Sequence, residues 1–240
     1  MRISSFFILL FLLLPATAQE PNPDPWEGFN RKMFAFNETM DKHLLKPAAQ
    51  GYRAITPKPV DRSLGNFFSN FGDIKVLISD LAQLKLAQAA SDTGRILVNT
   101  TLGFFGFFDV ATRLGMPKHQ EDFGQVLGYW GVGSGPYLML PFLGPSTVRD
   151  ISGTLVEYNY GVTLSALGEN EWEGWGIVGV YGLQVRARLL DMEGMISGDR
   201  YTFIRSFYLQ NREFLVRDGK IKDDFGDEEW EDDSEDSSAP

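Results

Sequence analysis

The chain has 240 residues, with 22 basic and 32 acidic side chains and a formal net charge of −10. Ten of the carboxylates lie in residues 223–240, which contain no Lys or Arg, so the rest of the chain balances at 22 against 22 and offers no basic surface for nucleic acid. The absence of Cys excludes disulfides, thiolate metal sites and a cysteine nucleophile, and only two His argue against a histidine-rich metal site.

The first 18 residues have the pattern of a secretory signal peptide. Arg2 supplies a positive start, residues 3–14 are apolar apart from two Ser, and Ala16-Thr17-Ala18 is a small-x-small cleavage site. About 12 apolar residues are too few to span roughly 30 Å of hydrocarbon. We therefore expect cleavage after Ala18 and export of residues 19–240 from the cytoplasm.

Apolar residues at helical spacing predict that residues 19–222 form one mostly α-helical domain. Asp24 is expected to cap the first helix, which Pro47 should limit, and residues 51–59 are expected to form a connector. Further helices are predicted within residues 60–84, 92–102, 146–156, 172–195 and 199–216. No long alternating strand pattern occurs.

Residues 103–115 are rich in Phe and Gly. Placed on a helix, their apolar side chains fill one broad arc, and a second set of polar and small residues flanks or opposes it. The apolar set includes Phe104, Phe105, Phe107, Phe108 and Leu114; the second set includes Asp109, Thr112, Arg113, Gly103 and Gly106. Such a stripe fits ordinary core packing or a helix lying at a membrane interface.

Residues 123–148 carry no formal charge, and their length alone would span a membrane. Six Gly and three Pro exclude one straight helix. If this segment lies in lipid, its bent backbone has to hide its polar groups against protein or a wet cavity.

Residues 223–240 have the composition of a disordered acidic tail. The tail is interpreted either as a solvated terminus or as a docking segment for a basic partner.

Catalytic motifs are weak throughout the chain. Ser134 lacks the glycines of a nucleophile elbow, and the G-x-G-x-x-G match at residues 174–179 does not follow an apolar strand. A secreted lipid hydrolase using Ser134 and His119 is kept as an alternative, as is a soluble periplasmic protein that binds an apolar ligand. We expect no enzyme activity.

Several linked motifs resemble those of the MlaA/VacJ family. They are D-P-W-E-G-F-N-R at residues 24–31, R-I-L-V-N-T-T-L-G-F-F-G-F-F-D-V-A-T-R-L at 95–114, D-F-G-Q-V-L at 122–127, G-P-Y at 135–137 and G-P-S at 144–146. The resemblance covers residues 24–216 with the motifs in the family's order.

The resemblance implies an outer-membrane protein that maintains lipid asymmetry in Gram-negative bacteria. Members remove misplaced phospholipids from the outer leaflet and deliver them to a soluble periplasmic carrier, MlaC. The implied fold is a ring of bent amphipathic helices embedded in the inner leaflet, with a polar-lined channel and an associated trimeric porin. No bond is broken, so no nucleophile, metal or cofactor is required.

On this basis we expect three groups of site residues. Phe104, Phe105, Phe107, Phe108 and Leu114 are predicted to contact lipid, Asp109, Thr112 and Arg113 to line the channel, and Gly103, Gly106 and Gly115 to permit bending or close packing.

One departure concerns attachment to the membrane. Many family members are lipoproteins modified on an N-terminal Cys, and this sequence has none. The sequence therefore predicts a protein that is not a lipoprotein, held in the outer membrane by its embedded helices and porin contacts, with its tail in the periplasm.

Overall fold

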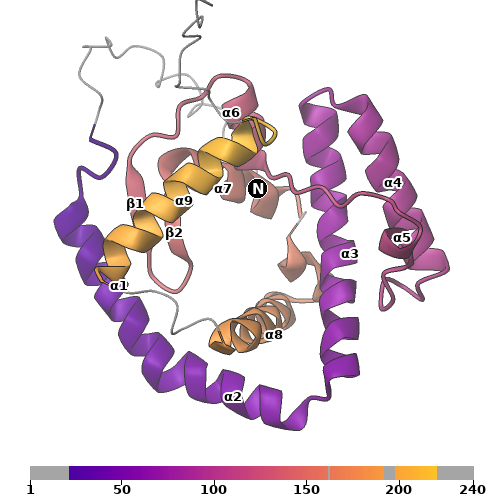
Figure 1. The fold of residues 1–240 in the computed structure, drawn as a ribbon, viewed down its shortest axis with the longest axis horizontal. Helices are drawn as coiled ribbons and strands as arrows, with labels where there is room; N and C mark the ends of the chain where they lie inside the picture. The colour runs from indigo at the N-terminus through magenta and orange to yellow at the C-terminus, as the bar shows by residue number, and fades with distance from the viewer. Residues whose placement is uncertain (1–21, 162, 192–197, 221–240) are drawn as a thin grey trace, which may run out of the picture.

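The computed structural model describes residues 22–161, 163–191 and 198–220, and the predicted signal peptide and acidic tail lie outside them. Within the described residues the helices are arranged as a ring (Figure 1). In chain order the elements are α1 (Glu27–Met40), the π-helix η1 (Asp41–Leu45), α2 (Lys46–Ile55), α3 (Lys58–Ala82), α4 (Leu86–Thr101), α5 (Val110–Arg113), α6 (Phe123–Tyr129), β1 (Tyr137–Leu140), β2 (Gly144–Thr147), α7 (Val148–Asn159), the 3₁₀-helix η2 (Leu164–Leu167), α8 (Glu171–Leu189) and α9 (Arg200–Val216). The mostly α-helical fold predicted from helical spacing and the ring-like arrangement implied by the family resemblance are both confirmed.

The first helical segment corrects two predictions. Pro47 does not end it, because the wide turn of η1 precedes Pro47 and α2 continues from Lys46. A π-turn relieves the clash that a proline ring makes with the carbonyl four residues earlier. Asp24 does not cap α1 either: the capping position is Trp26, and the buried Asp24 carboxylate bonds to other elements.

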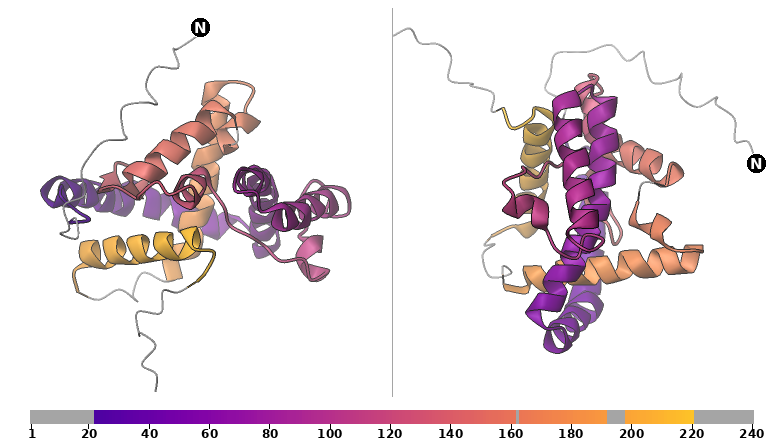
Figure 2. Two further views of the ribbon diagram at one scale, coloured as in Figure 1. Left: turned by 90° about the horizontal axis from the view of Figure 1, so that it is seen from above. Right: turned by 90° about the vertical axis from the view of Figure 1, so that its right-hand side faces the viewer.

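Figure 2 shows α4 lying beside α3 on the outside of the ring. Helix α9 lies on one face of the ring, and one end each of α7 and α8 projects from the other face. The α3–α4 interface buries polar side chains as well as apolar ones, among them Asp80, Asp92 and Arg95. Both helices begin before the predicted positions, at Lys58 and Leu86. Buried polar side chains need hydrogen-bond or ion-pair partners, and Asp80, Asp92 and Arg95 each have at least one.

The uncharged segment folds as α6, a loop and a short hairpin. Strands β1 and β2 are antiparallel, with Tyr137 opposite Thr147 and Leu140 opposite Gly144. Side chains from α1 and α9 pack on this hairpin around the buried Tyr137, Met139 and Tyr201. The segment is bent, as its Gly and Pro content predicts, and it contains two short strands that the sequence pattern does not predict.

Residues 102–108 form turns, so the prediction of a helix across residues 103–115 is wrong. Phe104 and Phe105 have φ of 50° and 56°, and Gly106 follows at 87°. Three consecutive left-handed residues cannot belong to a right-handed helix. The turn folds back on α4, because the amides of Phe105 and Gly106 donate to the carbonyls of Thr100 and Asn99.

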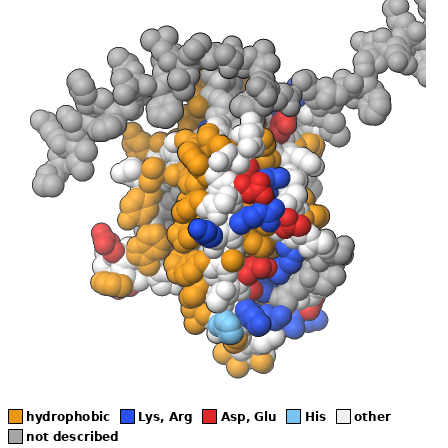
Figure 3. All heavy atoms as spheres, turned by 90° about the vertical axis from the view of Figure 1, so that its left-hand side faces the viewer, with side chains coloured by type: hydrophobic (Ala, Val, Ile, Leu, Met, Phe, Trp, Pro, Cys, Tyr) orange, Lys and Arg blue, Asp and Glu red, His pale blue; other side chains and the backbone are white. Residues whose placement is uncertain are grey.

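Many large apolar side chains are exposed. Figure 3 shows hydrophobic side chains gathered in a band beside charged ones on the face formed by the first helices. Exposed large apolar side chains of the described residues include Phe29 and Phe36 on α1, Leu44 on η1, Phe142 and Leu143 at the hairpin tip and Trp172 on α8. None of the helices in the described ranges is both long enough and apolar enough to cross a membrane. Exposure on this scale indicates surfaces that contact apolar partners.

Candidate functional site

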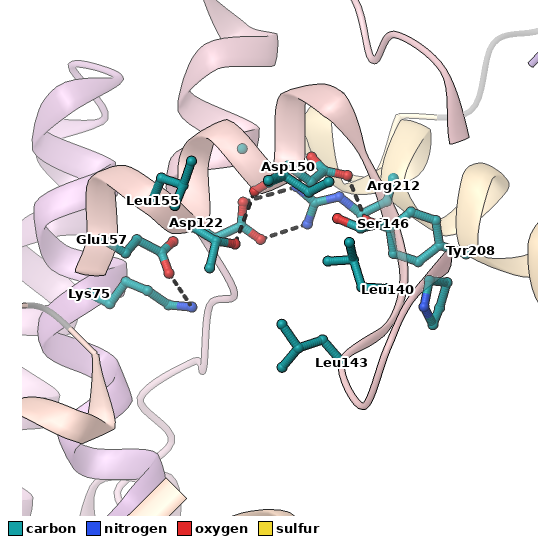
Figure 4. Close-up of a pocket in the computed structure, with 14 residues that line it drawn as sticks. Lys75, Asp122, Leu140, Leu143, Ser146, Asp150, Leu155, Glu157, Tyr208 and Arg212 are labelled. Atoms are coloured by element: carbon teal, nitrogen blue, oxygen red, sulfur yellow. Dashed lines mark hydrogen bonds and ion pairs between the residues drawn. The ribbon is translucent and has the colours of Figure 1, made fainter. Parts of the chain in front are cut away.

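A cavity of about 400 Å³ lies where α3, α6, the hairpin, α7 and α9 meet (Figure 4). Its wall has a polar part and an apolar part. The polar part contains Lys75, Asp122, Ser146, Asp150, Glu157, Tyr208 and Arg212, and the apolar part contains Leu140, Leu143, Pro145, Ile151 and Leu155.

Arg212 of α9 organises the polar wall. Its guanidinium donates to both oxygens of Asp122, at 2.6 and 2.9 Å, and to Asp150 Oδ1 at 2.7 Å. Burial alone would raise the pKa of Asp122, but the two bonds from Arg212 and the amide of Gln125 outweigh it and lower the pKa to about 2. The carboxylate is therefore ionised and fixed at neutral pH.

Local sequence places these groups. Asp122 caps α6 by accepting the Gln125 amide, and Thr147 caps α7 by accepting the amide of Asp150. Gly124 allows the three charges to meet, because a Cβ there would lie 2.5 Å from Asp150 Oδ1 and 2.7 Å from an Arg212 nitrogen. Tyr208 completes the cluster by donating to Asp150 Oδ2 at 2.6 Å.

Lys75 and Glu157 form a second pair across the cavity wall, with 3.6 Å between the Lys75 nitrogen and Glu157 Oε2. Glu157 Oε1 accepts the backbone amide of Phe123 at 3.0 Å. Burial raises the pKa of Glu157, and Lys75 opposes this shift.

The cavity therefore offers fixed charges together with leucine side chains, of which Leu140 and Leu143 come from the hairpin (Figure 4). Its size is that of a pocket for a small molecule or for the polar end of a larger amphiphile. Among the described residues, no cluster of His, Asp and Glu is placed to hold a metal ion.

The predicted lipid-contacting residues lie outside this cavity, beside α4 and α5. Phe104 and Phe105 are each 64% exposed, and Phe108 and Leu114 are also exposed. Phe107 differs, because its ring stacks on Phe67 of α3 with 5.2 Å between the centroids. Their contact with lipid stays a prediction.

The predicted channel residues do not line the cavity either. Asp109 caps α5, accepts the Thr112 hydroxyl at 2.6 Å and pairs with Arg95 at 3.4 Å. Burial would raise the pKa of Asp109, but the hydrogen bonds from Thr112 and Asn99 lower it below the usual value. Arg113 is exposed at the end of α5. The structure gives Asp109 and Thr112 local bonding partners, and the channel role of the three residues stays a prediction.

The three predicted hinge or packing glycines have different surroundings. A Cβ on Gly103 would lie 2.2 Å from the Phe108 carbonyl oxygen, and one on Gly106 would lie 2.6 Å from Asn70. Gly115 has a φ of 79° and no neighbour within 4 Å of such an atom. Gly103 and Gly106 are thus closely packed and Gly115 is not.

No motif in the sequence points to Lys75, Glu157 or Arg212. Asp122 begins the D-F-G-Q-V-L motif at residues 122–127, and Asp150 follows the G-P-S motif at 144–146 by four residues, so a signal exists for both. The other three come from separate helices, and Arg212 reaches Asp122 across 90 positions in the chain. Helical periodicity carries no information about such distant partners.

The residues of the hydrolase alternative are not joined in the structure. His119 Nδ1 lies 2.9 Å from the Asp92 carboxylate, and the Ser134 carbonyl accepts the amide of Arg149. No interaction links the Ser134 and His119 side chains within the described ranges. The geometry therefore gives no support to a hydrolase that uses this pair.

Comparisons with known proteins give a consistent result. A family model described as MlaA lipoprotein matches residues 22–215. Proteins from Escherichia coli (strain K12) and Shigella flexneri, each named "Intermembrane phospholipid transport system lipoprotein MlaA", are 36% identical over 217 residues, covering 86% of this chain and 83% of theirs. A structure described as "Structural basis for maintenance of bacterial outer membrane lipid asymmetry" matches with a TM-score of 0.72 and 35% identity, covering 80% of this chain and 98% of its own.

These names contradict the prediction that the chain is not a lipoprotein, since the family model and the named relatives are all described as lipoproteins. The prediction rested on the absence of Cys from a single sequence. An absence in one chain does not define how its family is attached to a membrane. The family match and the identity over most of the chain show that it belongs to the MlaA lipoprotein family.

Proposed function

We propose that this protein removes phospholipids misplaced in the outer leaflet of the Gram-negative outer membrane and transfers them to a periplasmic lipid carrier of the MlaC type. Its helices would lie in the inner leaflet beside a trimeric porin. Membership of the family supports this function, because the relatives are named as components of an intermembrane phospholipid transport system.

The observation that carries the proposal is that the cavity is lined by both charged and apolar side chains. A phospholipid has a charged headgroup joined to acyl chains, and a path for it needs polar groups next to an apolar surface. The ionic wall around Arg212 and the leucine wall of Leu140 and Leu143 meet this need side by side. The headgroup would pass the ionic wall while the acyl chains follow the leucines.

The exposed apolar surface supports embedding in one leaflet. Burying apolar area yields about 25 cal/mol per Å², so several exposed aromatic side chains together give substantial affinity for hydrocarbon. Phe29 and Phe36 on α1 and Trp172 on α8 are such side chains. Embedding without crossing also agrees with the lengths and polarity of the described helices.

Filling the cavity tests the function. Thr154 is an exposed position on α7 that lines the cavity, so Thr154→Trp should block it without disturbing the core. Ser152→Trp is the matched control, because Ser152 is exposed on the same helix and does not line the cavity. Each variant would be expressed in cells lacking the wild-type gene, and phospholipid in the outer leaflet would be measured.

We expect Ser152→Trp to restore lipid asymmetry and Thr154→Trp to leave phospholipid in the outer leaflet. Full restoration by Thr154→Trp, at wild-type protein level in the outer membrane, would contradict transport through this cavity.

A further inference from the structure

The charges around the cavity balance, but they are not equally well paired. The cations are Lys75, Arg212 and, behind the wall, Arg149; the carboxylates are Asp122, Asp150 and Glu157. Arg212 is held by bonds of 2.6 to 2.9 Å to two carboxylates, and Arg149 adds a longer contact of 3.4 Å to Asp150. On this side of the cavity both carboxylates are therefore firmly paired, and Arg212 Nε is a buried nitrogen without a hydrogen-bond partner among the described residues.

The Lys75–Glu157 pair is looser. Its 3.6 Å separation exceeds the length of a charge-assisted hydrogen bond. Glu157 is 6% exposed and is fixed by the Phe123 amide, whereas about a third of the Lys75 side chain is exposed. Burial raises the pKa of Glu157, so its ionised form lacks full stabilisation and would gain from a closer cation. In Figure 4 both charged ends face the cavity.

A ligand that carries one anionic and one cationic group would give Lys75 and Glu157 a closer partner each. A phosphate would accept hydrogen bonds from the Lys75 ammonium, and a primary ammonium a few bonds away would donate to Glu157 Oε2. Lys75 can swing toward such a phosphate because of its exposed, flexible stem. Glu157 need not move, because the Phe123 amide already orients it.

We propose that the cavity selects zwitterionic phospholipids, whose headgroup carries a phosphate and a cationic amine, over phospholipids with a purely anionic headgroup. This inference rests on the proposed function and names the substrate class of the same site. An anionic headgroup would satisfy Lys75 equally well, but it would bring negative charge close to Glu157 with no compensating cation. The remaining carboxylates, Asp122 and Asp150, are occupied by Arg212.

Lipid capture from mixed micelles tests the selection. The full chain, purified in mild detergent, would be equilibrated with equal amounts of phosphatidylethanolamine and phosphatidylglycerol, and the bound lipids would be extracted and counted. We expect roughly a threefold excess of bound phosphatidylethanolamine, which corresponds to a difference in binding free energy of about 0.7 kcal/mol.

Three variants test which side chains cause the lipid selection. Glu157→Gln keeps an oxygen for the Phe123 amide, so the fold should persist while the lipid ratio falls to one or below. Lys75→Gln should reduce the binding of both lipids. Glu213→Gln is the matched control, since it removes one carboxylate from an exposed pair with Arg217 on α9 and should leave the ratio unchanged.

Wild-type protein that binds both lipids in equal amounts, or a ratio that Glu157→Gln leaves unchanged, would overturn the selection while leaving transport intact. Folded wild-type protein that binds neither lipid would overturn the proposed function itself. Glycerophosphoethanolamine, the headgroup without acyl chains, should compete only at far higher concentration. Competition at equal concentration would make a free small molecule the ligand and would refute the lipid assignment.

Discussion

Three carboxylates are buried close together between α3, α4 and the segment before α6. Asp80 is 0% exposed, Asp92 is 1% and Glu121 is 6%. His119 contacts Asp92, and Lys85 donates to Glu121 at 2.8 Å, while Asp80 accepts a hydrogen bond from the uncharged amide of Gln88. Burial, together with the neighbouring Asp92 and Glu121, raises the pKa of Asp80 to about 7. Asp80 is therefore protonated in the folded protein below neutral pH.

Replacing Asp80 by Asn should stabilise the protein at alkaline pH. The folded pKa lies above the unfolded value, so the wild type loses stability as pH rises from about 4 through 7, and Asn removes this loss. Asn also retains an oxygen for Gln88. We expect a gain of about 1–3 kcal/mol at pH 8 that shrinks toward pH 5, measured by urea unfolding in detergent.

Asp191→Asn supplies the control for this comparison. Asp191 is 82% exposed in its pair with Arg53, so its substitution should change the free energy of unfolding by less than about 0.5 kcal/mol. An Asp80→Asn protein less stable than wild type at pH 8 would show that the Asp80 carboxylate is ionised and well paired.

At the scale of the elements, the turn at residues 102–108 contains both exposed and packed Phe side chains. Phe104 and Phe105 have left-handed φ and largely exposed side chains, whereas the ring of Phe107 packs on Phe67. The double variant Phe104→Asn with Phe105→Asn suits this backbone, because Asn tolerates left-handed φ. We expect it to fold normally and to be released from outer membranes by carbonate more readily than wild type.

Phe107→Asn is the contrasting variant. It removes a packed ring, so it should lower the free energy of unfolding by about 2–4 kcal/mol. Unchanged extraction of the Phe104/Phe105 double variant would argue that this turn does not enter the leaflet.

The turn at residues 102–108 also illustrates which features of the elements can be predicted from sequence and which cannot. Amphipathic spacing located α3, α7 and α9 to within a few residues, because burial of one helix face produces that spacing. It missed the first six residues of α4 and predicted an end for α8 beyond Leu189. Spacing does not report the sign of φ, so it predicts a helix across residues 103–115 although residues 102–108 form turns. It also cannot report a π-turn that lets α2 pass Pro47. For the cavity, Asp122 and Asp150 stood within or beside recognisable motifs, whereas Lys75, Glu157 and Arg212 depend on contacts between distant segments.

At the scale of the whole molecule, the ring is closed where α1 meets the β1–β2 hairpin and α9. Asn30 and Asn37 are seven residues apart and so lie on one face of α1. Asn30 donates to the Tyr137 carbonyl and accepts the amide of Met139, and Asn37 donates to the Leu140 carbonyl and accepts the amide of Phe142. Each side-chain amide thus pairs with the hairpin as a neighbouring strand would.

The same junction joins the N-terminal segment to α9. The buried Asp24 carboxylate accepts hydrogen bonds from Asn30, Tyr201 and Arg205. Burial would raise the pKa of Asp24, but these three donors lower it overall. Asn30 therefore links α1, β1 and, through Asp24, α9, so this one side chain connects segments that are more than 100 positions apart in the chain.

Asn30→Ala should open this junction. It leaves a buried amide, a buried carbonyl and part of Asp24 without partners, at a cost of about 1–3 kcal/mol for each buried group left unsatisfied. Asn159→Ala is the matched control, because Asn159 is exposed and bonds only within α7. Hydrogen exchange gives the local measurement: the Met139 amide should exchange faster in Asn30→Ala, while the Phe142 amide, held by Asn37, stays protected. Equal acceleration at both amides would mean that the hairpin detaches as one unit, and no acceleration at Met139 would show that Asn30 does not close the ring.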